Sequence, residues 1–196
     1  MLKNSVIYPF FVLFYIVFTI VGIKKKFPIT KHFFYLSLFI YFIGVISITL
    51  FPIPVNKALI QDIIKDGYTI NYNFIPFNSI FSILSNNNVK SIIRLLGGNI
   101  LMFIPLGYLI PMIFKSFSKF NKIVILGVAS SFLIEFAQGF IAYIIGYRYR
   151  IVDVDDIILN TFGAIIGYLV FTCTASAIGN IIDLNCFRFI KSNNCK

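Results

Sequence analysis

The sequence has 196 residues, of which 59% are hydrophobic and only 12% are charged. A soluble domain carries about twice that charged fraction, so this composition excludes an ordinary soluble globular protein and indicates a membrane protein. The formal net charge of +10 would suit nucleic-acid binding. The lysines and arginines stand in short blocks beside apolar runs, however, with no basic stripe interleaved with aromatics, and we therefore predict no nucleic-acid partner.

Five apolar runs are suited to crossing a hydrocarbon core of about 30 Å. They cover residues 6–23, 33–50, 98–114, 123–146 and 157–177. Residues 55–92 form a connection of mixed polarity, in which segment 73–84 is too short to span and is expected to be interfacial or re-entrant. The predicted fold class is all-α: a polytopic transmembrane helix bundle of about five spans plus this short segment, with residues 1–196 as a single domain.

The basic residues predict how the bundle is oriented. Lysines follow the first apolar run rather than precede it, so that run is expected to be an uncleaved span. Five spans put the two termini on opposite sides of the membrane. If the N-terminus is outside, ten basic residues fall in the cytoplasm and seven outside, in agreement with the positive-inside rule. The connection between the fourth and fifth runs would then face outward.

Neither cysteine nor histidine suggests a metal or redox site. Cys173, Cys186 and Cys195 have no spacing typical of a zinc site or a disulfide framework. The single histidine, His32, lies among lysines predicted to be cytoplasmic, away from the other polar groups considered below. We therefore predict no metal and no cofactor.

Polar and small residues form stripes on the last two apolar runs. Residues on the fifth run at spacings of four, three and four share one helix face, and these are Asp156, Asn160, Gly163 and Gly167. The fourth run carries a matching stripe, made of Gly127, Ser131, Glu135 and Gln138. Ionisable groups inside a membrane are costly and need partners. The two stripes are therefore expected to face each other, with Gly163 and Gly167 allowing a neighbouring helix to approach closely.

The connection after the fourth run brings further charges to these stripes. Asp153 precedes the predicted start of a helix and can cap it. An unbroken fourth helix would put Glu135 about 20 Å from Arg148 along the axis. We therefore expect a break near Gly139, which would let Arg148 or Arg150 neutralise the carboxylates. Asn99 would add an amide from the third run. Together these groups predict a polar cleft at the outer surface.

A family resemblance rests on three motifs in this order: NILMFIPLG at residues 99–107, EFAQ at 135–138 and RIVDVDDIILNTFG at 150–163. Together they resemble the VanZ-like family, small bacterial membrane proteins named for one associated with teicoplanin resistance, over residues 40–172. NFIPF at residues 73–77 resembles a further element of the family. The family's polar residues fall on Asn99, Glu135, Gln138, Arg150, Asp153, Asp156, Asn160 and Gly163. Arg148 is an extra arginine, which leaves the equivalent of the family's arginine ambiguous.

The resemblance implies the bacterial cell envelope and reduced susceptibility to glycopeptides, but it supplies no reaction. Our first hypothesis is that the cleft binds the head group of an envelope lipid or cell-wall precursor. Arg148 or Arg150 would hold a phosphate or carboxylate, with hydrogen bonds from Asn99, Gln138 and Asn160. Glu135 and Asp153 would orient the arginines.

Two alternatives stay open, and the partners follow from the same hypotheses. An intramembrane enzyme would use Glu135 as general acid or base beside Asp153, although the sequence shows no nucleophile–base pair. A structural subunit would have no ligand, its aspartates only capping a helix. The expected partners are membrane lipids together with a cell-wall precursor or a glycopeptide. The oligomeric state is left open.

Overall fold

The computed structural model describes residues 1–65, 72–86 and 88–179. Within these ranges the chain is helical, and its only β-type pairings are two isolated bridges. Five helices are long and apolar enough to cross a membrane, which confirms the predicted all-α bundle. They are α1 (Tyr8–Lys24) with the preceding turn η1 (Asn4–Val6), α2 (Ile29–Leu50), the continuous stretch of α5 (Val89–Ser91), η2 (Ile92–Gly97) and α6 (Gly98–Ile113), then α7 (Phe120–Ile145) and α8 (Val154–Gly179).

Three short helices lie in the connections between the long ones. The connection after α2 contains α3 (Lys57–Lys65) and α4 (Asn78–Ser85), and the turn η3 (Lys115–Phe117) joins α6 to α7. Helix α4 begins within the segment 73–84, which was expected to be interfacial or re-entrant, and ends one residue beyond it. Helix α3 has apolar residues on one side and was not predicted, because its nine residues are embedded in a polar connection.

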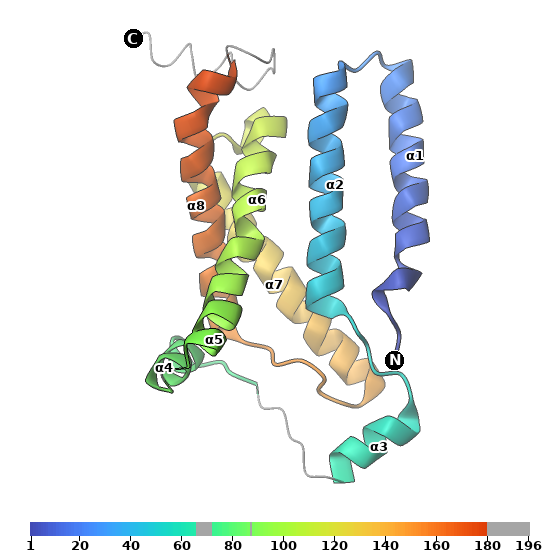
Figure 1. Ribbon diagram of the computed structural model, residues 1–196, viewed down its shortest axis with the longest axis vertical. Coiled ribbons are helices and arrows are strands. Elements are labelled where there is room, and N and C mark those ends of the chain that lie inside the picture. Colours follow the sequence, from blue (N-terminus) through green and yellow to red (C-terminus); the bar gives the residue numbers. More distant parts are fainter. Residues whose placement is uncertain (66–71, 87, 180–196) are drawn as a thin grey trace.

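Helix α8 lies beside α6, α7 crosses behind them, and α2 separates this group from α1 at the edge (Figure 1). The core between α2, α6, α7 and α8 is apolar, and its buried residues are Leu38, Phe103, Leu106, Ile110, Ile123 and Ala164. Helix α1 packs on α2 through aromatic side chains, with Phe11, Phe14 and Tyr15 around Phe39. Most of α1 is exposed and apolar, as expected of a helix that faces lipid.

Helices α6 and α8 touch backbone to backbone, because glycines line both sides of their interface. A Cβ atom on Gly163 would lie 2.1 Å from the carbonyl oxygen of Ile100, and one on Gly167 would lie 2.0 Å from another carbonyl of α6. From the other side, a Cβ on Gly107 would lie 1.9 Å from the carbonyl oxygen of Ala164. No side chain fits at these positions, and the small residues permit the close approach that stabilises helix pairs in membranes.

The expected break near Gly139 is wrong, because α7 continues through this residue to Ile145. Gly146 ends the helix with a left-handed conformation, φ +69°, which favours glycine. The chain from residue 147 to 153 then runs back to the start of α8 (Figure 1). This return path brings Asp153 to Glu135 without bending the helix.

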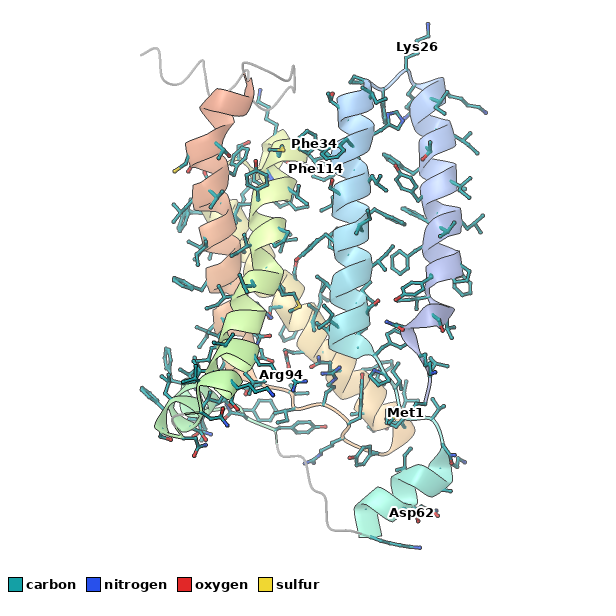
Figure 2. All side chains as sticks on the ribbon, viewed as in Figure 1. Met1, Lys26, Phe34, Asp62, Arg94 and Phe114 are labelled. Carbon is teal, nitrogen blue, oxygen red and sulfur yellow. The ribbon has the colours of Figure 1, made fainter. Side chains whose placement is uncertain are left out.

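The two ends of the bundle carry different connections. The α1–α2 turn with Lys26 lies at one end, and Met1, Asp62 and Arg94 lie at the other (Figure 2). Helices α3 and α4 and the α7–α8 connection share the end of Met1 (Figure 1). The predicted orientation requires the N-terminus and the α7–α8 connection to lie on the same side of the membrane, as they do here (Figure 1). The placement of the Met1 end outside the cell stays a prediction.

Candidate functional site

Asp153 connects the start of α8 to the segment before α4. Its Oδ1 accepts the backbone N–H of Asp155 at 2.9 Å, which makes it the N-cap that the sequence predicts. The same oxygen accepts Asn73 Nδ2 at 2.8 Å, and Oδ2 accepts the Ser79 hydroxyl. The backbones pair as well, since Asn73 N–H donates to the Val152 carbonyl at 3.0 Å. One carboxylate therefore orders two chain segments that are 80 residues apart in sequence.

Asp155 is buried and caps a different helix, α4. Its carboxylate accepts the backbone N–H groups of Phe77 and Ile80, the latter at 3.1 Å. These N–H groups are among those that a helix leaves without an intrahelical partner, and a carboxylate there is also favoured by the helix dipole. This contact was not predicted from the sequence. The signal that could have indicated this partner was NFIPF at residues 73–77.

The stripes of α7 and α8 face each other. All four residues of the predicted stripe on α7 are buried: Gly127, Ser131, Glu135 and Gln138. Asn160 Nδ2 donates to Ser131 Oγ at 2.8 Å across the helix interface. From α6, Asn99 Nδ2 donates to Asp156 Oδ1. The structure therefore brings together polar groups of the third, fourth and fifth predicted spans.

Glu135 has a backbone partner. Its side chain is 4% exposed, and Oε2 accepts the N–H of Asp153 at 3.0 Å. The sequence predicted an arginine beside it, but the guanidinium of Arg150 donates to carbonyls of α2 and that of Arg148 lies over the Tyr72 ring. The backbone N–H at the start of α8 takes the place of the expected cation, since helix N-termini favour negative groups.

Arg150 binds the carboxyl end of α2 rather than a carboxylate. One guanidinium nitrogen, Nη2, donates to the carbonyl oxygen of Ile48 at 3.0 Å and to that of Phe51 at 2.8 Å. The last four carbonyls of a helix have no intrahelical partner, and a cation there is also favoured by the helix dipole. Arg150 is therefore a capping residue for α2 as well as a charged group of the site.

Two neighbours of Arg150 complete this cap. Tyr149 donates its hydroxyl to the Leu50 carbonyl at 3.1 Å, and Gln138 Nε2 donates to the Thr49 carbonyl at 2.9 Å. Burial raises the pKa of the Tyr149 phenol, and the charge of Arg150 lowers it by less, so the hydroxyl remains a donor at neutral pH. The carbonyls of residues 48–51 thus all receive side-chain donors from α7 and the connection after it.

Arg148 is exposed and lies elsewhere. Its guanidinium is 4.3 Å from the centre of the Tyr72 ring, which is cation–π geometry. Arg148 does not line the polar cleft described below, whereas Arg150 does. This difference favours Arg150 as the equivalent of the family's arginine.

A polar cleft of about 600 Å³ lies between α4, η2, the α7–α8 connection and the start of α8. Its charged and amide-bearing walls include four of the predicted site residues, Gln138, Arg150, Asp153 and Asp156. Asp155, Asn78, Ser79, Ser82 and the hydroxyl-bearing Tyr149 complete the polar part of the lining. Asn99 contacts the cleft residue Asp156 through its amide, whereas Glu135, Asn160 and Arg148 do not line the cleft.

A second cavity, an apolar groove of about 400 Å³, runs along α7. Stacked rings of Phe132, Phe136 and Phe140 form one wall, with Tyr72 and Phe74 among the other lining residues. Asp153 borders both cavities, and Glu135 borders this groove alone. An acid or base role for Glu135 would therefore need its substrate in the apolar groove.

Among the described residues, no group of three or more His, Cys, Asp or Glu side chains is arranged to hold a metal ion. Cys173 is an exposed free thiol on α8, and Cys186 and Cys195 lie outside the described residues. The chemistry within the described part is therefore that of carboxylates, amides, hydroxyls and one guanidinium at the cleft.

Comparison with known proteins identifies the family. The family model described as VanZ/LLP1 matches residues 34–176, a range that begins in α2 and ends in α8. This range contains all the cleft residues named above and is slightly wider than the resemblance over residues 40–172. No curated protein and no solved structure matches the chain. The family match covers well over half of the sequence, and together with the five membrane-spanning helices it shows that this membrane protein belongs to the VanZ/LLP1 family.

Proposed function

We propose that the cleft binds the head group of an envelope lipid or a cell-wall precursor on the outer face of the bacterial cell membrane. The observation that carries this proposal is the polar lining of the cleft at the end of an otherwise apolar bundle. Polar groups in a membrane protein are retained where they face one another or a polar ligand. Residues 1–196 are proposed to act as this one domain.

The position of the cleft along the bundle supports a head group as the ligand rather than a lipid tail. Its walls come from a helix start (α8), from α4 and from the connection that caps α2, and these meet at one end of the bundle (Figure 1). Ends of membrane-spanning helices lie near the head-group layer. The volume of about 600 Å³ is within the usual range for small-molecule sites, roughly 300–1,000 Å³.

A link to teicoplanin is part of the same proposal. A protein that holds a lipid or precursor head group at the outer surface would change how much of it a glycopeptide can reach. The expected cellular effect is reduced susceptibility to teicoplanin in cells that express the protein.

A bulky side chain at an exposed lining residue would block the cleft and test the proposal. Ser82 lines the cleft and is exposed, so Ser82→Trp adds bulk there without removing a buried hydrogen bond. Ser85→Trp is the matched control, since Ser85 is exposed on the same helix and does not line the cleft. Native mass spectrometry of each purified full chain would measure the lipids and precursors that remain bound, and growth on teicoplanin would measure the effect in cells.

We expect Ser82→Trp to lose bound head group and resistance, while Ser85→Trp retains both at equal membrane abundance. A wild-type protein that carries no lipid or precursor beyond its detergent shell would overturn the proposal. Equal retention by both tryptophan variants would do so as well.

A further inference from the structure

We infer that the head group bound in the cleft carries an ammonium group. This inference rests on the proposed function, because it names the chemistry of the ligand at the same site. It follows from the charges that line the cleft and from one buried amide oxygen. Each of these observations is independent of the other.

The charged lining is mainly acidic. Asp153, Asp155 and Asp156 line the cleft, and Arg150 is the basic residue among the lining groups. The guanidinium of Arg150 already donates to two carbonyls of α2. An anionic head group would therefore meet three acidic side chains, whereas a cation would be attracted by them.

The three aspartates differ in how many of their carboxylate oxygens already accept a hydrogen bond from the protein. Both carboxylate oxygens of Asp153 and both of Asp155 accept hydrogen bonds from the protein. For Asp156, the described contacts give a donor to Oδ1, from Asn99. Its Oδ2 is therefore the carboxylate oxygen that we assign to the ligand.

Gln138 provides the second observation. This side chain is 7% exposed and lines the cleft, and its Nε2 is directed to the Thr49 carbonyl. A carbonyl only accepts, so this contact fixes which end of the amide faces it. The other end is Oε1, a buried oxygen that has no hydrogen-bond partner among the described residues. A buried acceptor without a partner costs about 1–3 kcal/mol. In our proposal a donor of the ligand removes this cost by reaching Oε1 from the cleft that Gln138 lines.

An ammonium matches both observations. It has three N–H donors, no acceptor and a positive charge. A phosphate or carboxylate offers acceptors only, so it could not satisfy Gln138 Oε1 and would lie against the aspartates. In the arrangement we propose, one N–H of the ammonium is directed to Asp156 and another to Gln138 Oε1.

The probes test whether the amine of the head group is recognised, and whether its source is a lipid or a cell-wall peptide. Purified full chain in detergent would be titrated with phosphatidylethanolamine, with its N-acetylated derivative and with phosphatidylglycerol, all with the same acyl chains. A soluble cell-wall pentapeptide with a lysine at its third position would test the precursor as a source of the same ammonium. Native mass spectrometry measures each affinity. We expect one of the two amine-bearing probes to bind at least about tenfold more tightly than both amine-free lipids.

Two variants test the assignment within the cleft. Asp156→Asn keeps an oxygen for Asn99 but removes the charge, and Leu95→Lys places a cation in the lining at a side chain that is 48% exposed. Each is expected to weaken the amine-bearing probe by about ten- to hundredfold, the equivalent of one charge-assisted hydrogen bond. Asp62→Asn, an equal charge change at an exposed residue of α3, is expected to leave affinity unchanged.

The outcomes distinguish this inference from the proposed function. If the acetylated lipid or phosphatidylglycerol binds as tightly as the amine-bearing probes, or if Leu95→Lys strengthens binding, the ammonium assignment is overturned and the head-group site stands. If no lipid and no peptide binds the wild type, the proposed function fails first. Asp156→Asn and Asp62→Asn with equal affinity would also overturn the assignment.

Discussion

The carboxylate of Asp155, at the start of α8, accepts the backbone N–H of Ile80, in the first turn of α4, at 3.1 Å. The two residues are 75 positions apart in sequence. Helix α4 is a wall of the cleft, and its eight residues are too few to be stable alone in water. This capping contact therefore helps to hold the wall in place, together with the hydrogen bond from Ser79 to Asp153.

Replacing Asp155 with alanine should release α4. The N–H groups of Phe77 and Ile80 would lose their acceptor, at a cost of about 1–3 kcal/mol in the free energy of unfolding. Amide hydrogen exchange of residues 77–85 should become faster than in the wild type. Asp62→Ala, at an exposed position on α3, serves as the control and should leave this exchange unchanged. Equal protection of α4 in both variants would contradict the capping role.

The two arginines should differ in their effect on stability. Arg150→Met keeps an apolar side chain but removes the donors to the Ile48 and Phe51 carbonyls, and it should lower the free energy of unfolding by about 1.5–3 kcal/mol. Arg148→Met removes a cation–π contact at an exposed side chain, worth about 0.5–1 kcal/mol. Denaturant titration in detergent measures both. A larger loss for Arg148→Met would reverse our assignment of the family's arginine.

Gly163→Ala should disrupt the pairing of α6 and α8. Its new methyl group would lie 2.1 Å from a backbone carbonyl oxygen, and backbone cannot yield as a flexible side chain can. Overpacking of this kind costs about 1–3 kcal/mol, occasionally more. Gly44→Ala is the matched control, because a Cβ there would meet nothing within 4 Å. Thermal unfolding of both variants tests the contact, and equal midpoints would refute it.

Substitutions at Glu135 separate a structural role from acid–base chemistry. Glu135→Gln retains an oxygen that can accept the Asp153 N–H, so folding and head-group binding should persist. Glu135→Leu removes the acceptor and should lower stability by about 1–3 kcal/mol. Thermal unfolding and native mass spectrometry measure the two effects. If Glu135→Gln folds and binds normally but loses its cellular phenotype, the intramembrane enzyme becomes the better hypothesis.

Cysteine labelling should establish the orientation. In a variant with Cys173, Cys186 and Cys195 replaced by serine, Tyr147→Cys would mark the α7–α8 connection and Lys25→Cys the α1–α2 turn. A membrane-impermeant maleimide applied to intact cells should label the first and spare the second. The reverse pattern would place the cleft in the cytoplasm and remove the outer head group as its ligand.

The sequence predicted the parts of this site that depend on helical periodicity. The spacing of Ser131, Glu135 and Gln138 indicated their common face on α7, and Asp153 was identified as a cap. The partners of Glu135 and Arg150 could not be predicted, because both are backbone groups, which every residue carries and no pattern identifies. The break expected near Gly139 was wrong for the same reason, because it assumed that the partner of Glu135 had to be an arginine side chain.

The contact between α6 and α8 has a consequence for how the cleft can respond to different ligands. Asn99 and Asp156 lie on these two helices, whose main chains are in close contact at Gly107, Gly163 and Gly167. Helix α4, by contrast, is attached through side-chain hydrogen bonds to aspartates. We therefore expect the cleft to accommodate head groups of different size through a tilt of α4, while α6 and α8 keep their positions. Substitutions in α4 should accordingly change ligand selectivity most readily during evolution.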